Sequence, residues 1–232
     1  MDKQRSVILF DLDGTLIDSV PDLALAINEM LRELGRSPYD EETIRFWIGN
    51  GSAMLVRRAL AGSREIPEGF DEELYARAHA IFLERYARVL ARATRPYPQV
   101  PETLELLKAR GYRMAIVTNK PGQFVAPILE RLGLAEYFDL IVGGEDLPVK
   151  KPDPAPLLYA CEELGVSPGK ALMVGDSAND ILAAKSAGIP VLAVAYGYTH
   201  GTPVEEYGPD RVVERFGELA ELLKGPGTES KE

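Results

Sequence analysis

The sequence predicts an α/β protein with a doubly wound parallel sheet and an inserted all-helical domain. Three observations lead to this prediction. Val7–Phe10 is a run of four apolar residues, which is typical of a strand buried on both faces. From residue 96 onward, short apolar runs alternate with helical patterns, as in parallel sheets covered by helices. Between these regions, residues 18–95 show helical spacing only, so we expect an insertion after the first strand.

The inserted region is predicted to hold four helices. Apolar residues recur at helical spacing from Leu23 to Leu34, with Pro21 in the first turn and Gly35 as the stop. Ser52 follows a Gly-Asn-Gly break and is expected to cap the third helix. The predicted helices cover about residues 23–34, 41–47, 52–61 and 74–89.

The alternating region is predicted to complete the sheet. Its strands are expected at residues 114–117, 140–142, 171–174, 191–194 and 211–213, and its helices at about residues 101–110, 121–132, 154–164, 178–187 and 216–224. We therefore divide the chain into a Rossmann-like catalytic core, residues 1–17 and 96–232, and a helical cap domain, residues 18–95, called the helical insert below. The polar tail, residues 225–232, is predicted to be disordered.

The composition limits the partners and the location of the protein. A net charge of −10 argues against nucleic acid or an anionic membrane as a partner. No stretch approaches the roughly 20 apolar residues of a membrane span. The single cysteine, Cys161, excludes an internal disulfide and is typical of a reducing cytoplasm. We expect a cytoplasmic monomer or homodimer, in which any anion site must carry its own local positive charge.

Two carboxylates follow the first strand. Alternation along an extended chain places Asp11 and Asp13 on the same side, and Gly14 lets the backbone turn sharply after them. Two such charges about 4 Å apart repel by roughly 4 kcal/mol at an effective dielectric constant of about 20. Protonation of one carboxylate or a cation between them relieves this repulsion. An Asp-Gly hairpin turn is the alternative, whereas an EF-hand calcium loop is excluded because its Gly stands at the sixth position after a helix.

Other polar residues follow the later strands. Ligands bind at the carboxyl ends of the strands in such sheets. Thr118 and Asn119 follow one strand, Asp176 follows another, and a loop after a third ends at Lys151. We therefore expect three carboxylates, a hydroxyl and a lysine at one edge of the sheet. The alternative for Thr118 or Asn119, and for Ser177, is a helix cap without further function.

These residues form four ordered motifs. Phe-Asp-Leu-Asp-Gly-Thr-Leu (10–16), the Thr118-Asn119 pair, Lys151-Pro152 and Gly-Asp-Ser-Ala-Asn-Asp (175–180) resemble the motifs of the haloacid dehalogenase superfamily. The resemblance covers essentially the whole chain, and the helical insert is similar to the cap that follows the first motif in that superfamily. Bacterial phosphoglycolate phosphatases are the most similar group within it, through Trp-Ile-Gly-Asn-Gly (47–51), Thr-Asn-Lys-Pro (118–121) and Tyr-Gly-Tyr (196–198).

The resemblance implies a mechanism by which the protein hydrolyses the phosphate ester of a small phosphorylated metabolite such as 2-phosphoglycolate. Asp11 is expected to attack phosphorus and form an aspartyl phosphate. Asp13 is expected to protonate the leaving oxygen and then to deprotonate the hydrolytic water. Lys151 and Thr118 are expected to hold the transferring oxygens, with Asn119 as a further substrate-binding residue.

The resemblance also implies a metal ion. Mg²⁺ is expected, with Mn²⁺ as a possible substitute, because hard oxygen ligands beside a phosphate select such ions. Asp11, the backbone carbonyl of Asp13 and Asp176 are the expected ligands. Ser177 and Asp180 are expected to support these ligands from behind.

The helical insert is expected to close over the sheet and exclude water. Its break could present Asn50 and Gly51 to the far end of the substrate, and Arg57 or Arg58 could meet a substrate carboxylate. The alternatives are a simple turn and a solvated pair of arginines. Residues read as structural or surface rather than functional are His79, His200, Cys161, Trp47, Tyr196 and Tyr198.

Rival functions share parts of this pattern. A phosphomutase that passes the phosphate to a sugar hydroxyl, or an inorganic diphosphatase, would use the same scaffold. The presence of Asp13, Asp176 and Asp180 argues against a dehalogenase, which needs no metal. A signalling receiver carries no helical cap, and a non-catalytic binding protein would lack part of the site, whereas no expected motif residue is missing here.

Overall fold

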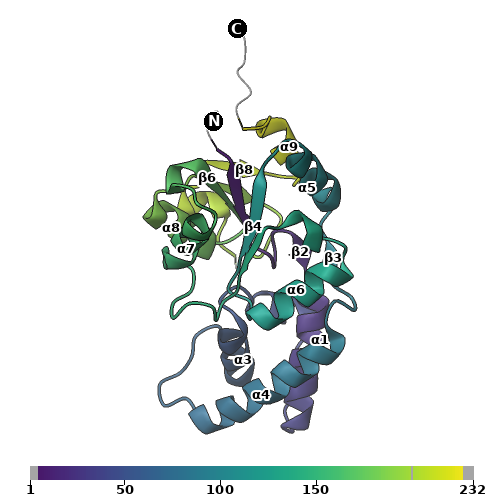
Figure 1. Ribbon diagram of the computed structural model, residues 1–232. Helices are drawn as coiled ribbons and strands as arrows, with labels where there is room; N and C mark the ends of the chain where they lie inside the picture. Colours follow the sequence, from purple (N-terminus) through teal and green to yellow (C-terminus); the bar gives the residue numbers. More distant parts are fainter. Residues whose placement is uncertain (1–4, 200, 227–232) are drawn as a thin grey trace.

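The computed structural model describes residues 5–199 and 201–226. Its upper part in Figure 1 is a sheet covered by helices, and its lower part is a bundle formed by the helical insert. The carboxyl ends of the strands face the bundle, because β1 (Val7–Phe10) runs from the N-terminus at the far end toward it. This arrangement places the residues that follow the strands between the two parts.

The main sheet has six parallel strands, as the sequence predicts. In spatial order they are β5 (Leu140–Val142), β4 (Arg113–Val117), β1, β6 (Ala171–Gly175), β7 (Val191–Val194) and β8 (Arg211–Val213). Phe10 is in register with Ile116 of β4 and Val174 of β6. The three strands at the centre of the sheet therefore end side by side.

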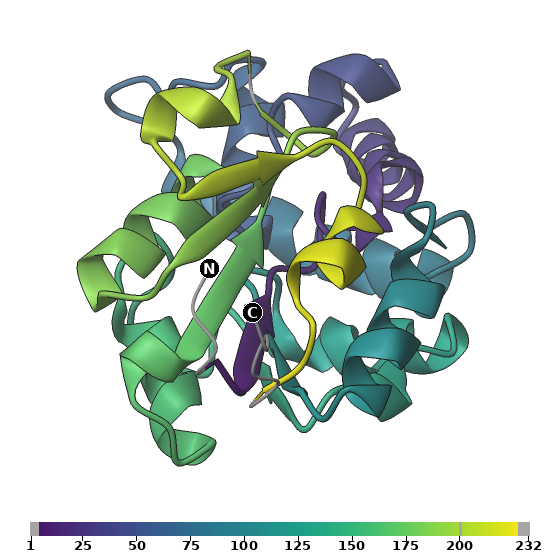
Figure 2. The same ribbon diagram turned by 90° about the horizontal axis from the view of Figure 1, so that it is seen from above.

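Two hydrophobic cores lie on the two faces of the sheet. Ile8 and Phe10 of β1 point into one core, and Val7 and Leu9 into the other, as the alternation of side chains in a strand requires. Figure 2 shows the helices on opposite sides of the sheet. The first core is covered by α5 (Val100–Ala109), α6 (Gly122–Arg131) and α9 (Glu218–Leu222), and the second by α7 (Ala155–Glu163) and α8 (Ala178–Ala187). All four residues of β1 are fully buried.

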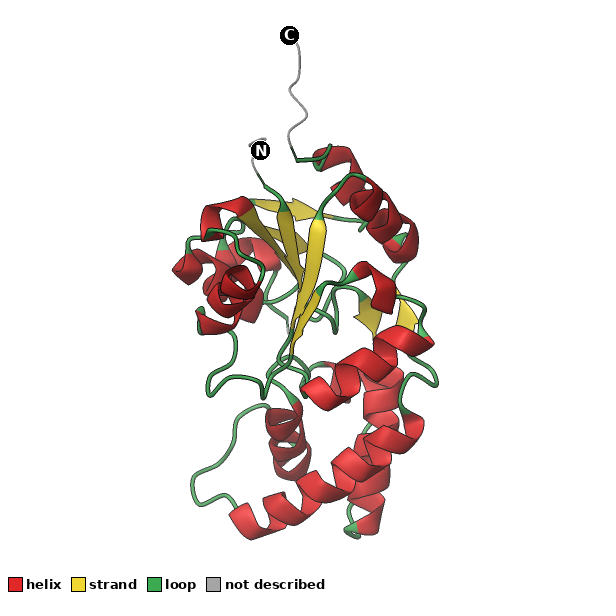
Figure 3. Ribbon diagram, in the orientation of Figure 1, coloured by secondary structure: helices red, strands yellow, loops and turns green. Residues whose placement is uncertain are grey.

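The helical insert packs four helices together, shown in red in the lower part of Figure 3. They are α1 (Val20–Glu33), α2 (Glu41–Arg45), α3 (Ser52–Ala61) and α4 (Glu72–Val89). Buried Asp22 ties the two ends of the insert together, because its carboxylate accepts hydrogen bonds from the backbone N–H groups of Ala93 and Thr94 and from the Thr94 hydroxyl. Whether the insert moves as a separate cap domain stays a prediction.

Most predicted elements agree with the structure to within two residues, but the connection to the insert differs. Ile17–Asp18 (β2) pairs antiparallel with Arg95–Pro96 (β3), so a short ribbon replaces the two single connections that the sequence suggests. Two-residue strands are too short to show periodicity. In the described part of the chain, short 3₁₀ helices also lie in the loops, at Ala135–Tyr137, Pro168–Lys170 and Val204–Tyr207.

Two further expectations concern Ser52 and the chain ends. The prediction that Ser52 caps α3 is wrong, because Gly51 holds the cap position and the Ser52 hydroxyl lies 2.9 Å from Nε2 of His79. His200 and residues 227–232 of the predicted disordered tail lie outside the described residues. Of the helices in the described part of the chain, none has the length and apolar character needed to span a bilayer.

Candidate active site

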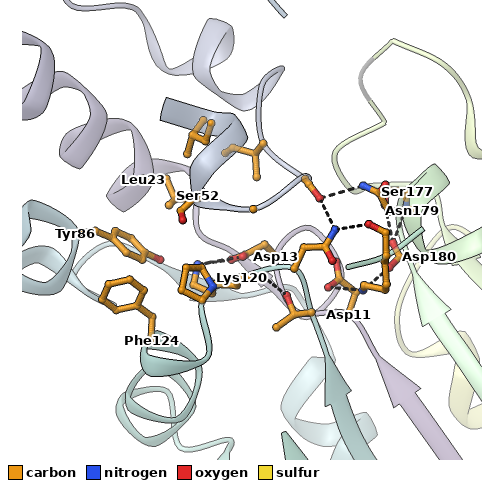
Figure 4. A pocket seen from close by; sticks show the side chains of 18 of the residues that line it. Asp11, Asp13, Leu23, Ser52, Tyr86, Lys120, Phe124, Ser177, Asn179 and Asp180 are labelled. Carbon is orange, nitrogen blue, oxygen red and sulfur yellow. Dashed lines mark hydrogen bonds and ion pairs between the residues drawn. The ribbon is translucent and has the colours of Figure 1, made fainter. Parts of the chain in front are cut away.

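The residues that follow β1, β4 and β6 meet at the carboxyl edge of the sheet. Asp11 follows β1, Thr118 follows β4 and Asp176 follows β6. Figure 4 shows side chains from the sheet and from the helical insert turned toward one pocket. The sequence-based expectation of polar groups at one edge therefore agrees with the geometry.

Lys151 lies between two carboxylates. Its Nζ donates to Oδ1 of Asp11 at 2.9 Å and to Oδ1 of Asp180 at 2.6 Å, and also to the Val117 carbonyl. The side chain of Lys151 is 2% exposed. Burial alone lowers the pKa of a lysine, but the carboxylates of Asp11 and Asp180 outweigh burial and raise the pKa of Lys151. Lys151 therefore stays cationic at the place where phosphate oxygens are expected.

Asp176 is held by two donors. Its Oδ1 accepts a hydrogen bond from the Thr15 hydroxyl at 2.8 Å, and its Oδ2 accepts one from the backbone N–H of Tyr198 at 2.7 Å. Glycine is required on both sides of it, because a Cβ at Gly14 or Gly197 would lie 2.3 or 2.2 Å from the Asp176 side chain. The backbone thus closes around this carboxylate.

Asp180, in the first turn of α8, supports the loop that carries Asp176. Its Oδ2 accepts hydrogen bonds from the backbone N–H and the hydroxyl of Ser177, at 3.1 and 2.7 Å. The backbone N–H of Asp176 donates to the same oxygen at 3.3 Å. Ser177 and Asp180 therefore hold the loop after β6, and Ser177 also occupies the cap position of α8, the alternative considered for it. Their expected support of the metal ligands stays a prediction.

The three carboxylates can hold a cation. One oxygen each of Asp11, Asp176 and Asp180 lies within 4.8 Å of the others. Burial raises the pKa of Asp11 to about 6, although Lys151 opposes the rise, and burial together with Asp180 and Asp11 raises the pKa of Asp176 well above its usual value. Lys151 offsets only one of the three charges, so the ionised site has two negative charges in excess. Hard oxygen ligands with excess negative charge fit Mg²⁺.

The carboxylate of Asp13 turns to the other side of the pocket. Both of its oxygens accept hydrogen bonds from Lys120 Nζ at 3.0 Å, and Oδ1 also accepts one from the Ser19 hydroxyl at 2.5 Å. Lys120 was not predicted to be a site residue. Lys120 directly follows Thr118 and Asn119 at the end of β4, so the rule that selected those two residues could have found it.

Thr118 and Asn119 do not cap a helix, because α6 begins at Gly122 with Pro121 at its cap position and no side-chain cap. Thr118 is 4% exposed and lines the pocket. The Asn119 amide nitrogen donates to the Lys151 carbonyl at 2.9 Å and to the Gly49 carbonyl at 3.3 Å. Asn119 therefore joins the lysine loop to the helical insert.

The Gly-Asn-Gly break of the insert meets the sheet edge. Asn179 of α8 donates to the Gly49 carbonyl at 3.0 Å, and Gly51 lines the pocket. Asn50 contacts Asn179 at 3.4 Å, while its side-chain oxygen accepts a hydrogen bond from Arg58. The break thus forms one of the contacts between the two parts of the molecule.

The structure does not bring Arg57 to the pocket. Its guanidinium pairs with Glu72 at 2.5 and 2.8 Å and lies over the Tyr75 ring, 3.8 Å from the centroid. Arg58 is 7% exposed and donates to the Trp47 carbonyl at 2.6 Å, so it holds the break rather than facing a substrate. A one-residue step turns a helix by about 100°, which is why two adjacent arginines meet different surroundings.

The residues read as structural are packed as expected where the structure describes them. Cys161 is 2% exposed in the core beneath the sheet, and Trp47 packs edge-to-face on Tyr39. The Tyr196 hydroxyl donates to the Thr15 carbonyl, and the Tyr198 hydroxyl donates to Asp18.

Apolar and polar residues share the pocket between sheet and insert. Asp11, Asp13, Thr118, Lys120 and Lys151 line it from the core. Its apolar lining residues are Leu23, Ile48, Leu55, Phe82, Pro121 and Phe124. A pocket of this kind suits a small ligand with a strongly polar end.

Comparisons with known proteins point to one family. The family model described as haloacid dehalogenase-like hydrolase matches residues 8–194. Phosphoglycolate phosphatase 1 of Pseudomonas aeruginosa is 51% identical over 213 residues, covering 92% of this chain and 78% of that protein. Phosphoglycolate phosphatase of Psychrobacter arcticus is 47% identical and covers 96% of both chains. The crystal structure of a protein described as a predicted phosphoglycolate phosphatase from Haemophilus somnus has a TM-score of 0.87 and 40% identity, covering 94% of this chain and 98% of that one.

Proposed function

Since the chain belongs to the haloacid dehalogenase-like hydrolase family and is a phosphatase, we propose that it hydrolyses 2-phosphoglycolate with Mg²⁺ through an aspartyl phosphate. The observation that carries this proposal is the pairing of Asp11 with Lys151 beside Asp176 and Asp180, with a second carboxylate, Asp13, on the opposite side. The phosphoglycolate phosphatases among its relatives support the substrate.

In the first step, a carboxylate oxygen of Asp11 attacks phosphorus while the bond from phosphorus to the ester oxygen breaks. Asp13 gives its proton to the leaving oxygen, so that glycolate departs as an alcohol. In the second step, Asp13 takes a proton from water, the water oxygen attacks phosphorus, and the bond to Asp11 breaks. Inorganic phosphate leaves and both carboxylates regain their starting state.

Lys151 and Thr118 hold the phosphoryl oxygens during both steps in this proposal. Their burial supports it, because a charge or dipole in a water-poor site stabilises developing charge more strongly than in water. Asp11, Asp176 and the carbonyl of Asp13 would hold Mg²⁺, which neutralises phosphate charge when bound. Asp180 keeps Lys151 and the loop after β6 in place.

We also propose that the protein works in the cytoplasm. Cys161 is buried and unpaired, which is typical of a protein that works in a reducing compartment.

Phosphate release from a panel of esters tests this function. The panel contains 2-phosphoglycolate, glucose phosphates, a nucleoside monophosphate and diphosphate ion, each with Mg²⁺ and with excess chelator. We expect metal-dependent release with a clear preference for 2-phosphoglycolate. Preference for another ester would keep the mechanism and overturn the substrate. Interconversion of glucose phosphates without release would favour a mutase, and preference for diphosphate ion would favour a diphosphatase.

A further inference from the structure

Lys120 and Lys151 are the two cations among the described residues that line the pocket. Lys151 already has two carboxylate partners, Asp11 and Asp180. Lys120 has one, Asp13, whose oxygens occupy two of the three hydrogen-bond donors of the ammonium. One more carboxylate at Lys120 would give it the same environment that Lys151 has.

Tyr86 of α4 places a polar group beside this lysine. Its side chain is 1% exposed, yet its hydroxyl has no hydrogen-bond partner in the described structure. The Lys120 ammonium lies 4.8 Å from the centre of the Tyr86 ring, and Figure 4 shows the hydroxyl turned toward Lys120. A buried hydroxyl without a partner destabilises the protein unless a ligand pairs with it.

The surroundings of Tyr86 hold the ring in place. Phe82 stacks on it with ring centres 5.7 Å apart, and Phe124 meets it edge-to-face at 5.0 Å. Burial raises the pKa of Tyr86 to about 12, although Lys120 opposes the rise. The hydroxyl therefore keeps its proton and can donate a hydrogen bond to an anion. An ammonium and a hydroxyl thus face the pocket beside the apolar rings of Phe82 and Phe124.

We propose that Lys120 and Tyr86 form the subsite that binds the carboxylate of the substrate. This inference rests on the proposed function and adds to it the residues that select a phosphorylated acid. In 2-phosphoglycolate the carboxylate is separated from the ester oxygen by one carbon. Asp13, which acts on that ester oxygen, is hydrogen-bonded to Lys120, so a carboxylate this close to the ester oxygen lies within reach of the ammonium.

The subsite is tested by comparing an acid with a neutral ester. We would measure kcat and KM for 2-phosphoglycolate and for ethyl phosphate, which lacks the carboxylate, in the wild type, Tyr86→Phe and Lys120→Met. The ratio of the two kcat/KM values cancels any effect on the shared chemistry, including a disturbed Asp13. We expect kcat/KM for 2-phosphoglycolate divided by kcat/KM for ethyl phosphate to fall about tenfold or more in each variant. The fall should come mainly from a higher KM for 2-phosphoglycolate, as expected for the loss of a charge-assisted hydrogen bond.

Tyr97→Phe is the matched control. Among the residues that the structure describes, the Tyr97 hydroxyl is also buried without a hydrogen-bond partner, and it does not line the pocket, so its removal should leave the ratio unchanged. Tyr86→Phe removes only a hydroxyl without a partner in the described structure, so we expect this variant to fold. If Lys120→Met fails to fold, the ratio measured in Tyr86→Phe still tests the subsite. An unchanged ratio in Tyr86→Phe, with a wild type that prefers the acid, would overturn the subsite and leave the proposed function intact. A wild type without preference for the acid would overturn the proposed substrate and the subsite together.

Discussion

The two ends of the pocket carry different charge, and only one of them includes residues of the helical insert, such as Tyr86 of α4. The sheet end consists of Asp11, Asp176, Asp180 and Lys151, and it has negative charge in excess. The insert end consists of Lys120, Tyr86 and the apolar residues around them, and its cation has a single carboxylate partner. We infer that the sheet end decides the type of reaction and the insert end decides the substrate.

The largest effect is expected at the sheet end. Asp11→Asn removes the proposed nucleophile at nearly constant volume, so turnover should fall by about 10⁴-fold or more while the fold stays intact. Phosphate release and thermal unfolding measure the two properties. Asp71→Asn, a change at the exposed cap of α4, is the control and should keep full activity. Activity of Asp11→Asn close to that of the wild type would end the covalent mechanism.

Asp13 belongs to both ends, because it acts on the leaving oxygen in the proposed mechanism and is paired with Lys120. Asp13→Asn should keep its backbone carbonyl as a metal ligand but lose proton transfer, so kcat should fall by about 10²- to 10⁴-fold. The measurement is single-turnover phosphate release with 2-phosphoglycolate. A nearly normal rate would remove Asp13 from the proton-transfer role.

The excess charge of the sheet end makes metal-free stability depend on pH. Burial raises the pKa of Asp11 from 3.8 to about 6, so the folded state binds its proton more tightly than the unfolded state. Stability of the metal-free protein should therefore fall as pH rises through this window, and the raised pKa of Asp176 acts in the same direction. A bound cation removes the penalty.

Thermal unfolding between pH 4 and 8, with and without Mg²⁺, checks this prediction. The rise of Tm caused by Mg²⁺ should be small near pH 4 and should grow as the carboxylates ionise. Asp11→Asn removes one of the titrating groups, so the growth should be weaker in that variant. The same rise of Tm at every pH would contradict the assignment of excess charge to these carboxylates.

The sheet end could be predicted from the sequence because a general rule locates it. Asp11, Thr118 and Asp176 each follow an apolar run, and parallel strands bring such positions to one edge. Lys151 lies in a loop whose path no periodicity defines, but that loop follows a strand, so the same rule places the lysine near this edge, and the family resemblance gives it a role. The rule for the carboxyl ends of parallel strands, together with the family motifs, is therefore sufficient to predict the residues of the sheet end.

The insert end could not be predicted in the same way. Tyr86 lies on the apolar stripe of α4 and has the pattern of a core residue, and a pattern does not tell whether a hydroxyl finds a partner. Lys120 follows β4 as Thr118 does, so the rule gives its position, but its pairing with Asp13 depends on a side-chain direction that the end of a strand does not fix. The β2–β3 ribbon is too short for any periodic signal.

The break between α2 and α3 offers a smaller test of the insert end. Arg58 holds the Trp47 carbonyl and the Asn50 side chain, and Gly49 in the same break binds Asn119 and Asn179. Arg58→Ala should lower the free energy of unfolding by about 2 kcal/mol, since buried acceptors lose a charged donor. Urea unfolding measures it. KM should rise for acid and neutral esters alike, because the break positions the insert rather than the carboxylate.

Apart from the controls, Arg57→Ala should have a smaller effect than any other variant proposed here. Arg57 is next to Arg58 in sequence, but it pairs with the exposed residue Glu72 outside the pocket, and such surface pairs contribute little. The acid-to-neutral ratio of kcat/KM should therefore stay at the wild-type value, with a stability change smaller than that of Arg58→Ala. A fall of the ratio in Arg57→Ala, with an unchanged ratio in Tyr86→Phe, would move the carboxylate site from the end of β4 to α3 and reverse our assignment of the insert end.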